Sequence, residues 1–352
     1  MLANRRKKRL QYLMENAGPT IRHLLFQRFD IGSNEERTSN YEEMLALPEV
    51  AKWRSLIPNE ISASTLLGSN DGCFENAFGK LLQFGLAIED ILTAKQRREY
   101  LRYLEVSTND DIYAWLARYV VASYFCITGE VHPTAVTIVT DRLQSLHSFV
   151  RSPSQRHNIF VDSLHAKLPK AYEGRKLINP GLYASGELCL PLVHDVFVFS
   201  HLYEQFDNEQ RRQVGDIIDF IADKKYQSID YGYGMVRSNK NKWHAMGWSA
   251  HMPLFNEQLS TAYFHKGLVF RAGLFSRLRN QKSSKWLASV FNTFEKFKID
   301  DFRFSFPGEL MPETPNSYYL NGRHLGLNEN RRQKEGRIIE STYYAHLVDI
   351  DG

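Results

Sequence analysis

Residues 190–221, LPLVHDVFVFSHLYEQFDNEQRRQVGDIIDFI, predict two consecutive helices of different character. The first, over 190–204, is apolar on almost every side. The second places apolar side chains at positions i, i+3, i+4 and i+7, namely Val214, Ile217, Ile218 and Ile221. That spacing defines one face of an amphipathic helix. An apolar helix followed by an amphipathic one predicts a buried inner helix beside an outer helix that faces water.

The helical period dominates the rest of the chain. Further helices are expected over 77–92, 95–105, 112–127, 133–150, 258–280 and 283–297. Start signals stand at Asp207 or Asn208, at Asn109-Asp110-Asp111 and at Ser283-Ser284. Only Tyr231–Arg237 and Asp301–Phe306 resemble strands, and both are short. The fold class predicted is therefore all-α, with short hairpin-like β segments.

A weak internal repeat supports a layered helical architecture. Ala94–Leu101 aligns with Asn208–Gly215, and each copy follows an apolar helix. Repeated helix pairs stack because no single pair can bury its own apolar face. We expect a two-layer ring of helices over residues 59–352, preceded by a helical extension over residues 1–58.

Composition places the chain among ordinary globular proteins. Its 352 residues are 43% hydrophobic and 24% charged, with a net charge of +4. The basic run Arg5–Arg9 is interpreted as a solvated helix start, with an anionic surface or nucleic acid as the alternative partner. No apolar run approaches the ~20 residues of a membrane span, and we expect no specific nucleic-acid binding.

Three widely spaced cysteines, Cys73, Cys126 and Cys189, argue against a disulfide framework and against a thiolate zinc site. A sparse, odd count fits a reducing compartment, so a cytoplasmic location is expected. Cys126 lies in an apolar helix and is expected to be a core residue. His194 and His201 are too far apart in sequence for a helix-borne zinc pair, so no metal or other cofactor is predicted.

The candidate ligand-binding residues lie in the segment that follows these two helices, up to Phe255. Its side chains combine a flat apolar body with a polar tip, a combination found in pockets for large apolar ligands. The expected ligand-binding residues are Tyr231, Tyr233, Trp243, His244, Trp248 and His251. The same residue types also fill ordinary cores, and packing of a loop over the barrel end is the alternative interpretation. Gly232-Tyr233-Gly234 is interpreted as a turn.

Asp195 and His194 are the expected catalytic residues. Apolar neighbours surround Asp195 in the sequence, and burial would raise its pKa and favour a neutral acid. A neutral acid facing an apolar cavity could protonate an alkene. The alternative is a structural aspartate that accepts hydrogen bonds from backbone or from an arginine. A second polar group, Glu329, Arg331, Arg332 and Glu340, is interpreted as an ion-pair network where the two chain ends meet.

Several motifs together resemble a known group of proteins. They are Leu190–Asp195, Lys225-Tyr226-Gln227, Gly232-Tyr233-Gly234, Met246–Pro253, Arg303–Pro307, Glu329–Arg332 and Glu340-Ser341-Thr342. Over roughly residues 60–350 the chain is similar to little-characterised bacterial proteins related to the prenyltransferase and squalene-cyclase repeat group. The resemblance implies an α/α toroid with a central cavity. The Asp-x-Asp-Asp motif of class II terpene cyclases is missing, so the resemblance does not carry over catalysis.

Three functions remain open from the sequence. The first is an isoprenoid-like, apolar-ligand binding protein or an atypical terpene-cyclase-like enzyme that uses the toroid cavity. The second is a non-catalytic scaffold that binds a peptide or protein partner. The third is an α/α-barrel carbohydrate-active enzyme, which requires two carboxylates facing one cleft. Glu187 and Asp195 are the pair that the sequence offers for the third.

Overall fold

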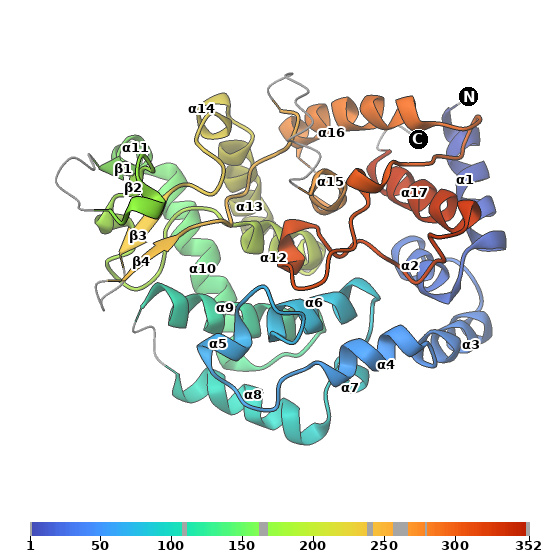
Figure 1. The fold of residues 1–352 in the computed structure, drawn as a ribbon, viewed down its shortest axis with the longest axis horizontal. Coiled ribbons are helices and arrows are strands. Elements are labelled where there is room, and N and C mark those ends of the chain that lie inside the picture. Colours follow the sequence, from blue (N-terminus) through green and yellow to red (C-terminus); the bar gives the residue numbers. More distant parts are fainter. Residues whose placement is uncertain are drawn as a thin grey trace. The chain divides into compact units, whose positions relative to one another are not determined.

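The computed structural model of the protein describes residues 2–107, 111–161, 168–237, 242–255, 267–278 and 280–349. It is 61% helix and 5% strand, which confirms the prediction of a mainly helical protein with little strand (Figure 1). Contacts between backbone segments divide the chain into two compact units. Unit 1 comprises Met1–Arg97 and Pro253–Gly352, and unit 2 comprises Arg98–Met252. The predicted boundary between residues 58 and 59 stays a prediction.

Unit 1 is built from both ends of the chain. Its N-terminal helices are α1 (Leu2–Asn16), α2 (Pro19–Phe29), α3 (Asn34–Leu45), α4 (Pro48–Ser55), α5 (Ala63–Leu66), α6 (Phe74–Gln83) and α7 (Ile88–Ile91). Its C-terminal helices are α15 (Leu268–Phe275), α16 (Gln281–Phe294) and α17 (Lys334–Val348), with 3-10 turns at Glu295–Phe297, Gly308–Leu310 and Tyr319–Asn321. Helix α17 packs against α1, α15 and α16, so the last helix closes the core begun by the first.

Unit 2 holds the remaining helices and the sheet. Its helices are α8 (Ala94–Val106, which begins at the end of unit 1), α9 (Ile112–Ile127), α10 (Pro133–Arg151), α11 (Pro153–His157), α12 (Val193–Leu202), α13 (Asn208–Ile221) and α14 (Lys224–Gln227), with 3-10 turns at Lys170–Tyr172 and Pro180–Leu182. Helix α9 packs against α10 and α12, and α10 also packs against α13. Helices α9 and α12 are buried on nearly all sides, whereas α13 buries only its apolar stripe. The predicted inner and outer helices are therefore present in this unit.

A small sheet of four strands lies in unit 2 (Figure 1). Its order is β1 (Phe160–Val161), β2 (Leu177–Ile178), β3 (Met235–Arg237) and β4 (Trp243–Ala245). The β1–β2 and β3–β4 pairs are antiparallel, and β2 pairs with β3 in parallel through Leu177 and Met235. The strand predicted over 231–237 is confirmed only at Met235–Arg237, which form β3, because the residues before them form a turn. Strands β1, β2 and β4 are too short to show a sequence period.

The strand predicted at 301–306 is wrong. Its backbone makes a single bridge, from Lys298 to Phe304. The N–H of Phe304 instead donates to the Thr342 hydroxyl at 3.1 Å, and that of Phe306 donates to the Ser341 hydroxyl at 2.9 Å. Between them, the N–H of Ser305 donates to the Phe297 carbonyl at 2.9 Å. The segment is therefore held by side chains of α17 and by backbone contact with Phe297, and not by a neighbouring strand.

Two helix predictions also need correction. The helix expected over 77–92 ends at Gln83, because Gly85 adopts a φ of +79° and reverses the chain before α7. The helix predicted over 283–297 begins earlier, at Gln281, since the Asn280 side chain accepts hydrogen bonds from the N–H groups of Lys282 and Ser283. Part of the helix expected over 258–280 and the Asn109-Asp110 start signal lie outside the described residues.

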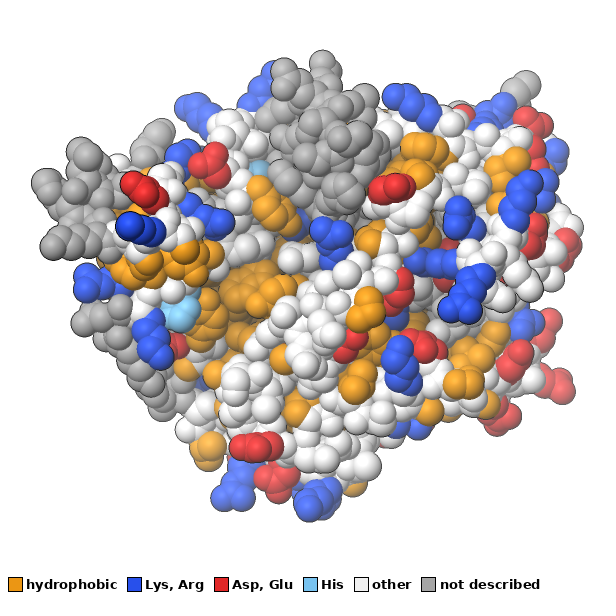
Figure 2. All heavy atoms as spheres, in the orientation of Figure 1, with side chains coloured by type: hydrophobic (Ala, Val, Ile, Leu, Met, Phe, Trp, Pro, Cys, Tyr) orange, Lys and Arg blue, Asp and Glu red, His pale blue; other side chains and the backbone are white. Residues whose placement is uncertain are grey.

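The two ends of the chain are tied together within unit 1. Arg9 of α1 forms an ion pair with Asp349 at the end of α17. The Tyr12 hydroxyl donates to Glu335 at 2.5 Å, and the N–H of Gly18 donates to Glu329 at 2.6 Å. Arg9 is 3% exposed, so the basic run is only partly solvated. On the face drawn in Figure 2, charged side chains of both signs are interspersed among the described residues.

Candidate functional site

In unit 2, the Asp195 carboxylate is held by a buried arginine. Arg142 of α10 donates to it from Nε at 2.8 Å and from Nη2 at 2.7 Å, and the N–H of Leu192 adds a third bond at 2.7 Å. Asp195 is 0% exposed and Arg142 is 1% exposed. Two parallel N–H donors matched to one carboxylate form a strong, geometrically specific pair.

The remaining donors of Arg142 fix the segment that leads into α12. They bond to the carbonyls of Leu188 at 2.6 Å and Leu190 at 3.0 Å, and to Glu187 at 2.8 Å. The guanidinium also lies over the Trp115 ring, 4.8 Å from its centroid. The expectation of a neutral Asp195 facing an apolar cavity therefore needs correction, because this carboxylate is paired with a fixed cation. The contacts of Asp195 match the alternative interpretation, a structural aspartate that accepts hydrogen bonds from backbone and from an arginine.

His194, the other expected catalytic residue, belongs to an aromatic cluster. Its ring meets Trp248 edge to face at 5.6 Å. Tyr113 contacts the same tryptophan at 6.2 Å and His244 at 4.5 Å. Burial lowers the pKa of His244, which favours its neutral form. Three of the predicted residues, His194, His244 and Trp248, are therefore brought together.

Tyr233 and His251 form a separate polar cluster beneath the turn. The Tyr233 hydroxyl bonds to the Pro191 carbonyl and lies 2.6 Å from the Tyr226 hydroxyl. The His251 ring bonds to the Ser249 hydroxyl at 2.7 Å and to the Ile229 carbonyl at 2.7 Å. Tyr231 contacts the His251 ring at 5.8 Å. These polar tips are satisfied by the protein itself, as expected for packing.

The Gly232-Tyr233-Gly234 turn is confirmed. Tyr233 has a φ of +60°, and a Cβ on Gly234 would lie 2.2 Å from the Lys176 carbonyl oxygen. Trp243, the last predicted ligand-binding residue, is half-buried and stacks under the Arg237 guanidinium at 5.5 Å. Among the described residues, the predicted site residues thus take part in these packed clusters, and a ligand-binding role for them stays a prediction.

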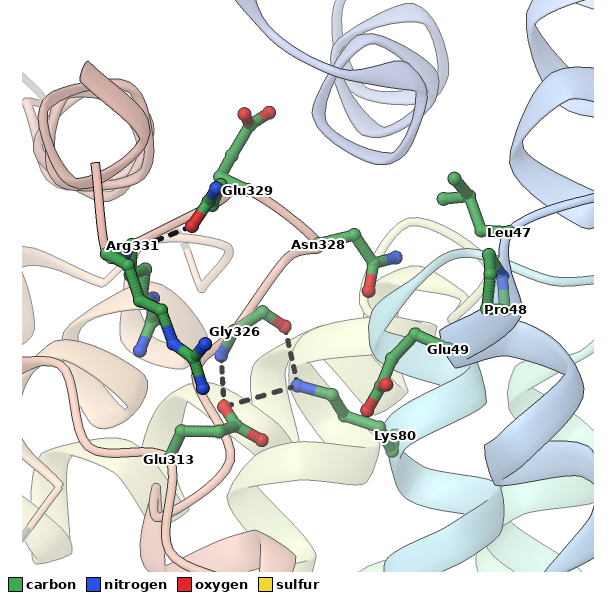
Figure 3. Close-up of a pocket in the computed structure, with 11 residues that line it drawn as sticks. Leu47, Pro48, Glu49, Lys80, Glu313, Gly326, Asn328, Glu329 and Arg331 are labelled. Atoms are coloured by element: carbon green, nitrogen blue, oxygen red, sulfur yellow. Dashed lines mark hydrogen bonds and ion pairs between the residues drawn. The ribbon is translucent and has the colours of Figure 1, made fainter. Parts of the chain in front are cut away.

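A cavity of about 580 Å³ is present in unit 1 (Figure 3). Its lining carries three basic and three acidic residues among amides and a small apolar wall. They are Leu47, Pro48, Glu49, Lys80, Glu313, Gly326, Asn328, Glu329, Asn330, Arg331 and Arg332. A volume of this size suits a small ligand. The cavity is made by the start of α4, the middle of α6 and the segment that precedes α17.

Lys80 forms the floor of this cavity. It is 1% exposed, and its ammonium donates to the carbonyls of His324 at 3.0 Å and Gly326 at 2.5 Å. Glu313 lies 3.7 Å from the same nitrogen. Burial lowers the pKa of Lys80, and the charge of Glu313 opposes that shift. Since its donors are occupied, Lys80 positions the 324–326 segment.

Two carboxylates flank the Lys80 ammonium. Figure 3 shows the carboxyl groups of Glu49 and Glu313 on either side of it. Glu313 accepts the N–H of Gly326 at 2.5 Å, and Glu49 accepts the Trp53 indole N–H at 2.9 Å. Burial acts to raise the pKa of Glu313, but Lys80, His324 and the Gly326 N–H outweigh it and lower the pKa to about 2. Glu313 is therefore ionised across the physiological range.

Arg331 supplies a donor that no described group uses. Its Nε pairs with the buried Glu340, and Nη1 donates to the Met311 carbonyl at 2.6 Å. Its Nη2 is buried and has no hydrogen-bond partner among the described residues. In Figure 3 the guanidinium points toward the space shared with Glu313 and Lys80. The predicted network is thus partly present, since the Arg331–Glu340 pair forms, but Arg332 is exposed.

Glu329 lines the cavity with its carboxyl group turned away from Lys80 (Figure 3). The carboxyl accepts the N–H of Gly18, which precedes α2. Burial raises the pKa of Glu329 to about 7, and the neighbouring Glu340 adds to that shift. Glu329 and Glu313 thus differ widely in pKa although they line the same cavity.

Sequence reasoning missed Lys80, Glu49 and Glu313 as members of a site. Lys80 carried one signal, because it interrupts the apolar face of FENAFGKLLQ, where an unpaired lysine would be costly. Glu49 and Glu313 carried none, since each lies in an ordinary polar context. Arg331 and Glu329 were singled out, but as a structural network.

Among the described residues, no group of three His, Cys, Asp or Glu side chains is arranged to hold a metal ion. Within the same ranges, no helix combines the length and apolarity that crossing a membrane requires. Cys73, Cys126 and Cys189 are free thiols, and burial raises the pKa of Cys126 to about 12. The core position expected for Cys126 is confirmed.

Comparisons with protein-family models, with curated proteins and with solved structures found no match to this chain. The resemblance to the prenyltransferase and squalene-cyclase repeat group stays a prediction.

Proposed function

We propose that the unit 1 cavity binds a small polyhydroxylated ligand, of the size and chemistry of a mono- or disaccharide. The observation that carries the proposal is that Glu49, Glu313 and Arg331 line one cavity, and that the buried Nη2 of Arg331 has no hydrogen-bond partner among the described residues. A carbohydrate-active enzyme, the third function expected from the sequence, requires two carboxylates that face one cleft. For that role we propose Glu49 and Glu313 in place of Glu187 and Asp195.

Charge balance supports an uncharged ligand. The lining holds Glu49, Glu313 and Glu329 against Lys80, Arg331 and Arg332. A ligand with several negative charges, such as a diphosphate, would meet the carboxylates without an excess of cations.

Hydrogen-bonding capacity supports a ligand rich in hydroxyl groups. Each hydroxyl can donate to a carboxylate oxygen and accept from an arginine N–H or an amide. Glu49 and Glu313 provide acceptors, and Arg331 with Asn328 provides donors. A buried donor that lacks a partner costs free energy, so a ligand oxygen at Arg331 Nη2 would be stabilising.

A calorimetric titration with a panel of mono- and disaccharides tests the proposal. We expect one saccharide to bind saturably, and Glu313→Gln and Glu49→Gln each to weaken it by about tenfold or more, the loss of a charge-assisted hydrogen bond. Glu60→Gln, on an exposed side chain of the same unit, should bind as the wild type does. Binding of farnesol or of free amino acids in place of every saccharide would contradict it.

The earlier functional expectations have less support. The terpene-cyclase-like hypothesis depends on a proton from Asp195, and that carboxylate is paired with Arg142. A scaffold that binds a peptide, and a cytoplasmic location, stay predictions. The α/α toroid also stays our proposal for the helix arrangement, supported by the alternation of buried α9 and α12 with the more exposed α10 and α13.

A further inference from the structure

A second cluster in unit 1 gathers cations from different parts of the chain. Arg28 lies in the last turn of α2, and its Nη2 donates to the Ser276 hydroxyl, just after α15, at 3.3 Å. The next residue is Arg277. The two guanidinium groups are near enough that the charge of Arg277 lowers the pKa of Arg28, although burial contributes more to its fall to about 10. Burial likewise lowers the pKa of Arg277.

No carboxylate of the described residues balances this pair. Among the described residues, neither Arg28 nor Arg277 forms an ion pair with an aspartate or glutamate, although most other arginines of unit 1 do or lie at the surface. The Arg28 Nη1 atom is buried and has no hydrogen-bond partner in the described part of the chain. Keeping two like charges partly buried without a counter-ion is costly, because Coulomb repulsion grows as water is removed.

Side chains of α17 add neutral hydrogen-bonding groups next to the pair. His346 is 1% exposed, and neither of its ring nitrogens has a partner among the described residues. Its ring contacts Phe29, the residue after Arg28, with 5.1 Å between centroids. Burial, with further contributions from Arg9, Arg6 and Arg28, lowers its pKa to about 3. The imidazole is therefore neutral and offers one N–H donor and one acceptor.

Tyr343 stands one turn before His346 on the same helix. Its phenol lies close enough to Arg28 and Arg277 for both charges to act on it, against the stronger effect of burial. The two guanidinium groups, the phenol and the imidazole N–H can all donate hydrogen bonds. The two guanidinium groups also carry one positive charge each. A phosphate group matches them, with up to two negative charges and several acceptor oxygens.

From this convergence we propose that Arg28 and Arg277, with Tyr343 and His346, form a binding site for a phosphate group. The site is separate from the cavity proposed for the polyhydroxylated ligand and does not depend on it. The phosphate oxygens accept hydrogen bonds from Arg28 Nη1 and from the one N–H of the neutral His346 ring, neither of which has a partner among the described residues.

Thermal melting with inorganic phosphate tests this site. For the wild type, phosphate at ten times its Kd should raise the melting temperature by roughly 2 °C, in a saturable manner. Sodium chloride at equal ionic strength should not reproduce the rise. Arg277→Met and Arg28→Met should each abolish it. Arg37→Met, an arginine of the same unit paired with Asp30, should retain it.

Folding of the variants gives a separate readout. Without phosphate, Arg277→Met should melt at or above the wild-type temperature, because an unbalanced cation has been removed. No saturable rise up to about 50 mM phosphate, or an equal rise in Arg277→Met, would overturn the proposal. A saturable rise that Arg28→Met and Arg277→Met lose and Arg37→Met keeps supports it.

Discussion

The Arg142 guanidinium donates two hydrogen bonds to the Asp195 carboxylate, from Nε at 2.8 Å and from Nη2 at 2.7 Å. Both side chains are fully buried, and the same arginine also holds the backbone carbonyls of Leu188 and Leu190. The pair therefore joins α10 to the start of α12 and fixes the segment between them.

Asp195→Asn is predicted to destabilise the protein by about 3–5 kcal/mol, because it leaves the Arg142 charge buried without its counter-ion. Urea denaturation measures the change. Asp216→Asn, which alters a partly exposed ion pair of α13, should cost less than about 1 kcal/mol. A loss at Asp195→Asn no larger than that of the control would show that the pair does not stabilise unit 2.

Lys80→Met is predicted to lower stability by about 2–4 kcal/mol, since it removes the partner of two buried carbonyls and of Glu313. The variant should also lose affinity for the cavity ligand, because the 324–326 segment is no longer anchored. Lys95→Met, on an exposed lysine of the same unit, serves as the control. Unchanged urea unfolding in Lys80→Met would contradict this role.

Glu329 should make stability depend on pH near neutrality. Its pKa is raised to about 7 in the folded protein, so the stability it contributes is complete below its unfolded pKa near 4.5 and is lost as the pH rises through 7. Glu329→Gln should therefore match the wild type near pH 4.5 and exceed it at pH 8 by on the order of 2–3 kcal/mol. Melting curves across this range, with Glu60→Gln as control, measure the difference. Parallel curves for Glu329→Gln and wild type would show that the carboxyl is not shifted.

The three thiols should differ in reactivity. Burial raises the pKa of Cys126 to about 12 and also raises those of Cys73 and Cys189. Cys189 is only half-buried, so a thiol reagent should modify it first in the native protein. Cys73 and Cys126 should react only on unfolding. Rapid native labelling of Cys126, located by peptide mass mapping, would contradict the buried position.

Local patterns in the sequence predict much of unit 2. The spacing of Val214, Ile217, Ile218 and Ile221 gives α13 with its correct buried face, and Asp207 caps it as one of the two expected start residues. The all-round apolar character of α9 likewise predicts its burial. Such features depend on neighbours within one or two turns, which a single sequence displays directly.

Features that depend on distant partners could not be predicted in this way. Asp195 looks like an isolated acid among apolar residues until Arg142, 53 positions earlier, is placed against it. The cavity of unit 1 joins Glu49 and Lys80 to Glu313 and Arg331, which lie more than two hundred residues further along the chain. The spacing of residues along the sequence does not indicate these long-range contacts. Sequence patterns therefore favour the aromatic segment of unit 2 as the site.

The most direct test of the proposed function is a crystal structure of the protein grown with the saccharide that binds best. We predict electron density for one ligand molecule in the unit 1 cavity, with hydroxyl groups bonded to Glu49, Glu313 and Arg331 Nη2. Density among His194, Trp248 and His244 of unit 2 instead, with the unit 1 cavity holding only water, would contradict the account.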